Sequence, residues 1–149
     1  SEAGFPEEAG REDSEDVDKG RALDIFQAVQ ENDVRRVKQV LHYWPESIRL
    51  RWGPAELTPL HMAIGAGNHS VARLLVDAGA DVNAPSREGR TPLHQAVGRA
   101  DASLVALLVE KRADVDVKSH GISPRQAAEA AGYDDIVEVL DQTRTDFEA

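Results

Sequence analysis

The chain repeats itself at intervals the size of one small structural unit. The segment "TPLHMAIGAGNHSVARLLVDAGADVN" begins at Thr58, "TPLHQAVGRADASLVALLVEKRADVD" begins at Thr91, and the shorter "SPRQAAEAAGYDDIVEVL" begins at Ser123. The spacings are 33 and 32 residues. Similarity at a fixed period of roughly 20 to 50 residues indicates that one unit is stacked several times. The repeat therefore constrains the fold more strongly than any local propensity.

Each unit contains two short helical patterns joined by a glycine or polar turn. Helices this short are marginal alone, because nucleation is unfavourable. Stacking must supply the core, so the sequence predicts an all-α solenoid of four helix-turn-helix units, each stabilised by its neighbours. The second helix of each unit places apolar residues at i, i+3 and i+4: Val37, Val40 and Leu41; Val71, Leu74 and Leu75; Leu104, Leu107 and Leu108; Ile136, Val139 and Leu140.

The repeats divide the chain into an acidic N-terminal tail, a repeat domain and a short C-terminal tail. Residues 1–19 hold eight acidic and two basic side chains, a net charge of −6 out of −10 for the whole chain. With few apolar residues, this segment cannot offset the entropy of ordering, so we expect a disordered tail that solubilises the protein or acts as an interaction or autoinhibitory segment. The expected boundaries are 1–19, 20–142 and 143–149, with repeats at about 20–53, 54–86, 87–119 and 120–142.

The quartet Thr-Pro-Leu-His has the residue order of a helix start. Proline is favoured at the first helical position, because its missing N–H would be unpaired there, and a preceding threonine can cap the free amides. The leucine belongs to the packed stripe. The histidine can accept a hydrogen bond from the threonine and donate one to a carbonyl of the neighbouring repeat. The predicted structural residues are Thr58, Pro59, Leu60, His61, Thr91, Pro92, Leu93 and His94.

These features resemble the ankyrin repeat family. The two quartets, the alanine two positions after each, the "GADVNA" of Gly79–Ala84 and the period of 33 residues match, over about Gly20–Leu140. The resemblance implies L-shaped repeats of two antiparallel helices with a projecting hairpin finger. The first and last copies read "LDIF" (Leu23–Phe26) and "SPRQ" (Ser123–Gln126), as expected of terminal repeats that face solvent. Arg112 replaces the glycine after the third repeat's second helix, where a left-handed turn would be strained.

The sequence gives no support for catalysis or metal binding. His61 and His94 belong to neighbouring repeats, whose helices stack about 8 to 10 Å apart, whereas zinc-bound nitrogens lie about 2.1 Å from the metal. Cysteine is absent, which excludes disulfides, thiolate metal sites and a cysteine nucleophile. Neither a phosphate-cradling glycine loop nor a nucleophile elbow occurs. We expect no catalytic residue, no cofactor and no metal.

The charge and hydropathy of the chain limit the kinds of partner that we expect it to bind and the cellular compartments in which we expect it to act. A net charge of −10 argues against nucleic acid, whose backbone requires clustered lysine and arginine. No apolar run approaches the roughly 18 residues needed to span a bilayer, and no secretory signal is present, so we expect a soluble protein without membrane insertion. The cytoplasm or nucleus is expected. Because the chain does not begin with methionine, a chloroplast or another organelle, after removal of a targeting peptide, is an alternative. The oligomeric state stays open.

The resemblance implies that a partner protein binds to the concave face and the fingertips. The expected fingers are positively charged within an acidic protein, which favours an acidic partner segment, and Trp and Arg are enriched at binding hot spots. Alternatively, the arginines are ordinary solvated residues and Trp52 folds back on the first repeat. Small residues on the inner helices, Gly65, Ala66 and Gly98, are expected to leave room for a peptide or helix. The candidate contact residues are Arg49, Arg51 and Trp52 of the first finger, Arg87 and Arg90 of the second, Lys118 and His120 of the third, and Met62, Gln95 and Arg99 of the inner helices.

The expected function is a non-enzymatic protein–protein interaction module, an adaptor or scaffold. The size and repeat number also resemble ankyrin-type inhibitors of cyclin-dependent kinases, and an organellar protein-sorting or chaperone factor is a third alternative. Asn83, together with Leu75, Asp81 and Val82, has the spacing at which ankyrin repeats resemble substrates of asparaginyl hydroxylase. The simpler alternative is that Asn83 is a turn residue, because asparagine side chains bond readily to nearby backbone.

Overall fold

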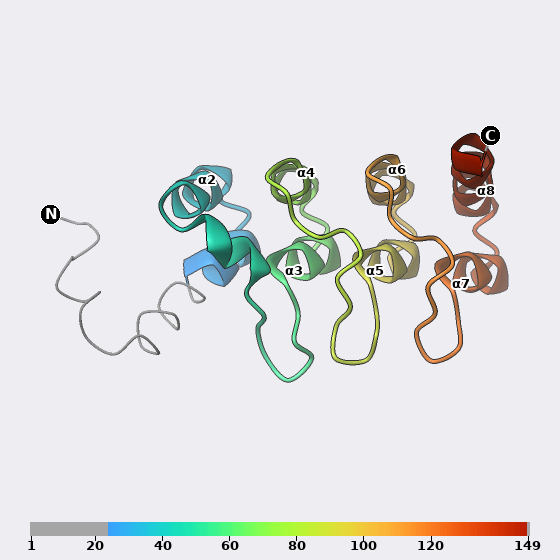
Figure 1. Cartoon of the computed structure of the whole chain (residues 1–149), viewed down its shortest axis with the longest axis horizontal. Coiled ribbons are helices and arrows are strands. Elements are labelled where there is room, and N and C mark those ends of the chain that lie inside the picture. The colour runs from blue at the N-terminus through green and yellow to red at the C-terminus, as the bar shows by residue number, and fades with distance from the viewer. Residues whose placement is uncertain (1–23, 149) are drawn as a thin grey trace, which may run out of the picture.

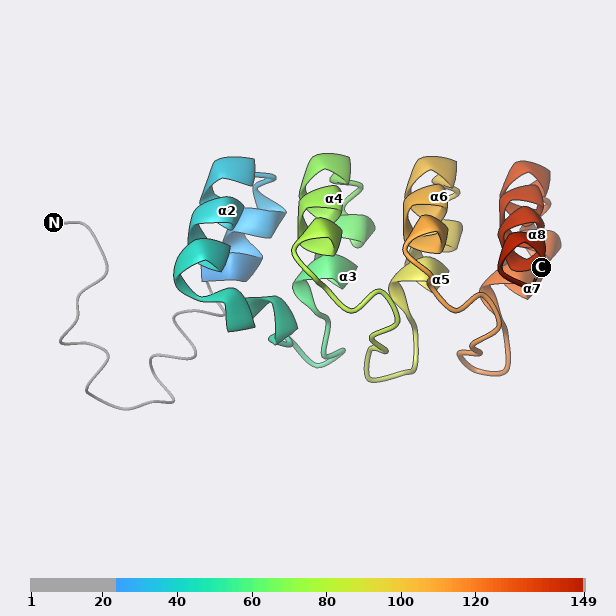
Figure 2. The ribbon, with the colours of Figure 1, turned by 45° about the horizontal axis from the view of Figure 1, so that its top comes forward.

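The computed structural model describes residues 24–148, where pairs of helices stand side by side in a row (Figures 1 and 2). The expected tail at residues 1–19 lies outside the described residues. The all-α repeat solenoid that the sequence predicts is confirmed. The pairs are residues 24–30 with α2 (Val34–Tyr43), α3 (Pro59–Gly65) with α4 (His69–Asp77), α5 (Pro92–Gly98) with α6 (Ala102–Glu110), and α7 (Pro124–Ala131) with α8 (Asp134–Glu148).

The helices form two parallel rows. The inner row consists of residues 24–30, α3, α5 and α7, and the outer row of α2, α4, α6 and α8. Successive members of a row pack against one another, as α3 does with α5 and α5 with α7. The hairpin fingers project from the inner row, on the side away from the outer row (Figure 1). A helix pair together with its finger therefore has the L shape that the resemblance implies.

The core runs continuously between the two rows and joins all four repeats. Leu75 and Leu108 of the predicted outer-row stripe are fully buried, whereas Leu74 is only half-buried. Burying one such side chain contributes about 1.5 to 3 kcal/mol. Alanines are fully buried where the inner helices approach their neighbours, and these positions are Ala63, Ala96 and Ala128.

Three inner helices begin with the same arrangement of hydrogen bonds. Thr58 accepts from the main-chain N–H of His61, while the ring of His61 accepts from the N–H of Thr58. α5 repeats this capping box with its own threonine and histidine. In α7, Ser123 and Gln126 form an equivalent box. The last repeat therefore has different residues at the positions of the quartet but keeps the same helix cap.

The turns after the two central outer helices, α4 and α6, adopt a left-handed conformation. Gly79, after α4, has a φ of +103°, and Arg112, after α6, has a φ of +69°. This conformation is free of steric cost for glycine and unfavourable for a residue with a Cβ atom. Arg112, which replaces the glycine of the second repeat, therefore adopts the left-handed turn that the sequence indicated would be strained there.

The connection between the first two repeats contains a 3-10 helix that the sequence did not reveal. This helix, η2 (Pro45–Arg49), packs on α2 and buries Ile48. The first finger (residues 52–57) begins only after it, so the prediction that Arg49 projects from that finger is wrong. The second and third fingers are residues 86–90 and 119–122, and hydrogen bonds between their end residues close all three hairpins.

The C-terminal boundary also differs from the expectation. α8 continues to Glu148, beyond residue 142, so residues 143–148 extend the last helix instead of forming a separate tail. No helix among residues 24–148 is both long enough and apolar enough to cross a membrane.

Candidate protein-binding face

The two quartet histidines link each repeat to the next. The Nε2 atom of His61 lies 2.9 Å from the main-chain oxygen of Arg90, and that of His94 lies 3.0 Å from the oxygen of Ile122. A carbonyl oxygen can only accept, so Nε2 carries the proton and Nδ1 is free to accept from the threonine of the capping box. Both acceptors belong to the following repeat, as the sequence predicts, and both lie in a finger.

The environment of these histidines keeps them neutral. Burial lowers the pKa of both rings, and the hydrogen bond to the carbonyl opposes this shift only in part. The positive charges of Arg51 and Arg90 lower the His61 pKa further. Among residues 24–148 no group of three histidine, aspartate or glutamate side chains could hold a metal ion. The geometry gives both rings a structural role.

The first and second fingers are tied together by main-chain groups. Arg51 donates through Nη1 to the main-chain oxygen of Glu56, 3.1 Å away, and to that of Pro85 in the next repeat. The N–H of Arg87 donates to the oxygen of Ala55 at 2.8 Å. The predicted contact residue Arg51 is therefore partly occupied in joining repeats, whereas the side chain of Arg87 is exposed.

The second and third fingers are joined in a similar way. The hydroxyl of Ser119 donates to the oxygen of Glu88 at 3.1 Å, and the exposed His120 lies 3.5 Å from the carboxylate of Glu88. Below the fingers, Asn83 accepts through Oδ1 from the N–H of Asp114, 2.7 Å away in the next repeat. Asn83 thus links two repeats. From the sequence, only a local role in the turn was considered as the alternative to hydroxylation. Its hydroxylation stays a prediction.

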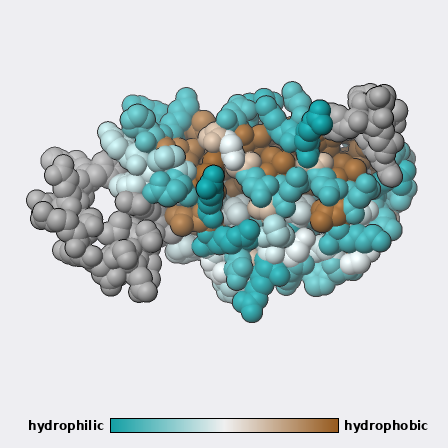
Figure 3. Space-filling model, in the orientation of Figure 1, coloured by the Kyte–Doolittle hydropathy of each residue, from teal (hydrophilic) through white to brown (hydrophobic). Residues whose placement is uncertain are grey.

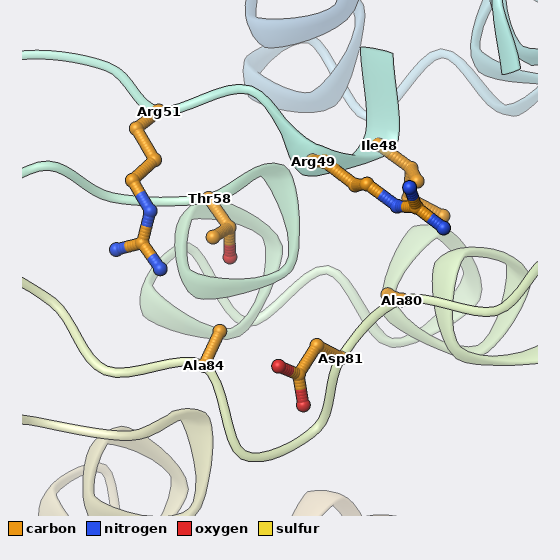
Figure 4. Close-up of a pocket in the computed structure, with 7 residues that line it drawn as sticks. All are labelled: Ile48, Arg49, Arg51, Thr58, Ala80, Asp81 and Ala84. Carbon is orange, nitrogen blue, oxygen red and sulfur yellow. The ribbon is translucent and has the colours of Figure 1, made fainter. Parts of the chain in front are cut away.

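A small pocket of about 160 Å³ lies between η2, the base of the first finger and the turn after α4. Figure 4 shows Arg49 and Arg51 on one side of it and Asp81 on the other. Pockets that hold cofactors are usually about 300 Å³ or larger, so this one is large enough only for a small side chain. Its lining residues are Ile48, Arg49, Arg51, Thr58, Ala80, Asp81 and Ala84.

Two large apolar side chains are exposed on the fingers. Trp52 is 41% exposed, and its ring centroid lies 5.5 Å from that of Phe26 in the first repeat. Trp52 therefore combines both alternatives: one part packs back on the first repeat and the rest faces solvent. Ile122, on the third finger, is 50% exposed. Sequence reasoning missed Ile122, although an isoleucine in a short hairpin was the available signal.

The inner row holds the remaining predicted contact residues. Met62 and Gln95 are half-buried. Arg99 donates through Nη1 to the oxygen of Gly65 at 2.8 Å, and the guanidinium of Arg90 lies against Gly98. The expected room above these small residues is therefore partly filled by arginine side chains. The exposed Lys118 comes just before the third finger. Hydrophilic side chains cover most of the face of the molecule that Figure 3 shows.

Comparisons with known proteins agree with the repeat architecture described above. A family model described as "Ankyrin repeats (3 copies)" matches residues 25–119, and such repeats generally serve as non-enzymatic protein–protein interaction modules. The chain is 30% identical over 67 residues to the E3 ubiquitin-protein ligase XBAT32 of Arabidopsis thaliana, covering 45% of this chain and 13% of the relative. It is 51% identical over 45 residues to the ankyrin-repeat domain containing transcription coregulator asaA of Aspergillus flavus, covering 30% and 12%. The chain thus spans about an eighth of these relatives, and it belongs to the ankyrin-repeat family.

Proposed function

We propose that this chain is a non-enzymatic adaptor or scaffold module that binds a partner protein through its fingers and inner row. The observation that supports this most is the fixed row of fingers. Hydrogen bonds between successive fingers hold exposed Trp52 and Ile122 on either side of the exposed cation Arg87. A surface ordered before binding loses less conformational entropy when the partner arrives.

The charge of the fingers supports an acidic partner segment. Arg87, Arg90 and Lys118 are exposed on a chain whose net charge is −10, and complementary charge raises both association rate and specificity. The similarity to a transcription coregulator supports the nucleus as the place of action over the organellar alternative.

The test is a quantitative comparison of captured proteins. The full chain, Trp52→Ala and Arg87→Glu are immobilised in parallel and exposed to extract of the source organism. Arg73→Glu is the matched control, because Arg73 is exposed on the outer helix α4, away from the fingers. We expect at least one protein to be lost from both finger variants and retained by the control, with unchanged helical circular dichroism.

Identical sets of captured proteins for all four baits would contradict the proposal. The identity of a protein that depends on the fingers separates the finer alternatives. A kinase supports the inhibitor function, and a membrane-protein precursor supports a sorting or chaperone function.

A further inference from the structure

The basic residues of this protein gather on the side of the fingers and the inner row. Residues 49–66, 86–99 and 118–122, which include the three fingers, α3 and α5, contain six basic and two acidic residues. The rest of residues 24–148 contains eight basic and seventeen acidic residues. So uneven a distribution creates a local positive field on a protein that is negative overall.

The cations on this side lack acidic partners in the described part of the chain. By contrast, Arg36 and Lys111 of the outer row are paired with Asp24 and Asp77. Some of the finger-side cations donate to main-chain oxygens, as Arg99 does to Gly65, but such a bond leaves the charge without a counter-ion. No carboxylate of residues 24–148 lies within ion-pair distance of Arg49, Arg51, Arg87, Arg90, Arg99 or Lys118.

The chain enters the described structure beside the first finger. The ring centroid of Phe26 lies 5.5 Å from that of Trp52, and residues 24–30 are the first member of the inner row (Figure 1). The acidic segment 1–19 ends five residues before Asp24. Nineteen residues can extend over about 60 Å, whereas three fingers stacked about 8 to 10 Å apart cover only about 20 Å. The segment is therefore long enough to reach every finger.

We propose that residues 1–19 bind the finger-side cations of the same chain and cover the face on which the partner is proposed to bind. The net charge of this segment is −6, which complements the unpaired cations. Because the segment is tethered, its effective concentration at the fingers is on the order of mM, so even a weak contact is populated. The inference rests on the proposed function, since it concerns the regulation of the same face, but its occupant belongs to this chain.

The outer helix α2 offers a second cluster of cations but no net charge. Residues 31–46 contain three basic and three acidic residues, and Arg36 of this cluster is bound to Asp24 and Glu31. Attraction and repulsion of an acidic segment therefore largely cancel there. The finger side remains the favoured position.

The experiment places a nitroxide spin label in the acidic segment of the full chain. Because the chain contains no cysteine, Gly10→Cys gives a single point of attachment among the acids. A nitroxide broadens the NMR signals of amides close to it. We expect the amides of the second finger (residues 86–90) to lose signal, while those of α4 keep theirs. Salt at about 1 M, where the screening length is about 3 Å, should restore the finger signals.

Three labelled variants identify the groups that make the contact. Replacement of the eight acids of residues 1–19 by amides leaves the tether and the label unchanged, so the finger signals should return. Arg87→Gln combined with Arg90→Gln should restore them in part. Arg35→Gln combined with Lys38→Gln, on α2, removes the same charge and should have no effect. Unchanged positions of the remaining amide signals show that each variant is folded.

Four results would overturn the inference. The first is the absence of any selective loss at the fingers, and the second is a loss that persists after the acids are neutralised. A loss that is greatest on α2 would place the segment on the outer row. A loss in a mixture of spin-labelled chain and separate isotope-labelled chain would make another copy the occupant. No partner is present, so these results leave the proposed function untouched, and a failed capture experiment would leave the contact of residues 1–19 standing.

Discussion

The Nε2 atom of His61 lies 2.9 Å from the main-chain oxygen of Arg90, so the residue that completes one helix cap also holds the next repeat's finger. His94 makes the same bond to Ile122, one repeat further along. Helix initiation and finger position are thereby coupled through a single side chain. Changes at these histidines should therefore affect both the stability of the array and the placement of its binding surface.

Acidification should destabilise the protein through these two rings. Their folded-state pKa lies below the ordinary value of about 6.5. As the pH falls below about 6.5, the unfolded chain takes up protons before the folded one does. The stability from His61 and His94 is therefore fully present above this value and is lost as the pH falls toward the folded-state pKa. Urea unfolding at pH 7.5, 6.5 and 5.5 measures the loss.

His94→Gln is the control that isolates this contribution. The box of Ser123 and Gln126 shows that glutamine can complete the cap without titrating. The shorter reach of glutamine should lose the bond to Ile122, which costs about 1 kcal/mol at pH 7.5. The further loss on going to pH 5.5 should then be smaller than in the original chain. An equal loss in both proteins would place the pH dependence elsewhere.

Removal of the threonine cap should destabilise the third repeat. Thr91→Ala removes the acceptor for the N–H of His94, and loss of such a cap typically costs about 1 kcal/mol. Ser70→Ala, at an exposed position of α4, should change the free energy of unfolding by less than about 0.5 kcal/mol. Urea denaturation of the two variants gives the comparison, and similar values would argue against the cap.

The link between Asn83 and Asp114 should be visible in amide exchange. Asn83→Ala removes the acceptor that lies 2.7 Å from the Asp114 N–H, and loss of one such bond costs about 1 kcal/mol. Hydrogen exchange should accelerate at Asp114, while amides within α4 keep their protection relative to global stability. Uniform acceleration along the chain would indicate a general loss of stability instead.

Two glycines of the second repeat should respond to alanine in opposite directions. Gly65 ends α3, and an added Cβ would meet Gln95 Nε2 at an ordinary contact distance of 3.6 Å. Gly65→Ala should therefore stabilise the protein by about 0.5 to 1 kcal/mol through the unfolded chain. Gly79 has open space around it but a φ of +103°, so Gly79→Ala should destabilise it. Thermal unfolding of both variants decides the signs.

The features that the sequence predicts correctly depend on short spacings. The cap formed by Thr58 and His61 spans three positions, and the apolar stripe of each outer helix spans four. Such local patterns determine which atoms come into contact within one repeat, whatever the arrangement of the neighbouring repeats. The left-handed turn at Arg112 was also predictable, because the second repeat has a glycine at the equivalent place.

The features that the sequence did not predict depend on stacking. The bond from Arg99 to Gly65 joins residues 34 positions apart, and such long side chains partly fill the room expected above the small inner residues. Which atom of a neighbouring repeat an arginine reaches depends on small rotations between repeats, which no motif encodes. η2 was missed for another reason: Pro45 marked its start, but five residues carry too little periodicity to distinguish a 3-10 helix from a loop.

In the described part of the chain, the side-chain hydrogen bonds between repeats join residues roughly one repeat apart, from 28 positions for His94 and Ile122 to 39 for Asn68 and Val29. The bonds from His61, His94, Arg99, Asn83 and Ser119 span 28 to 34 positions. During synthesis each repeat can therefore complete its contacts with the preceding one as soon as about one further repeat has left the ribosome, without waiting for the C-terminus. The same geometry leaves the most recently made repeat as the least supported part of a growing chain.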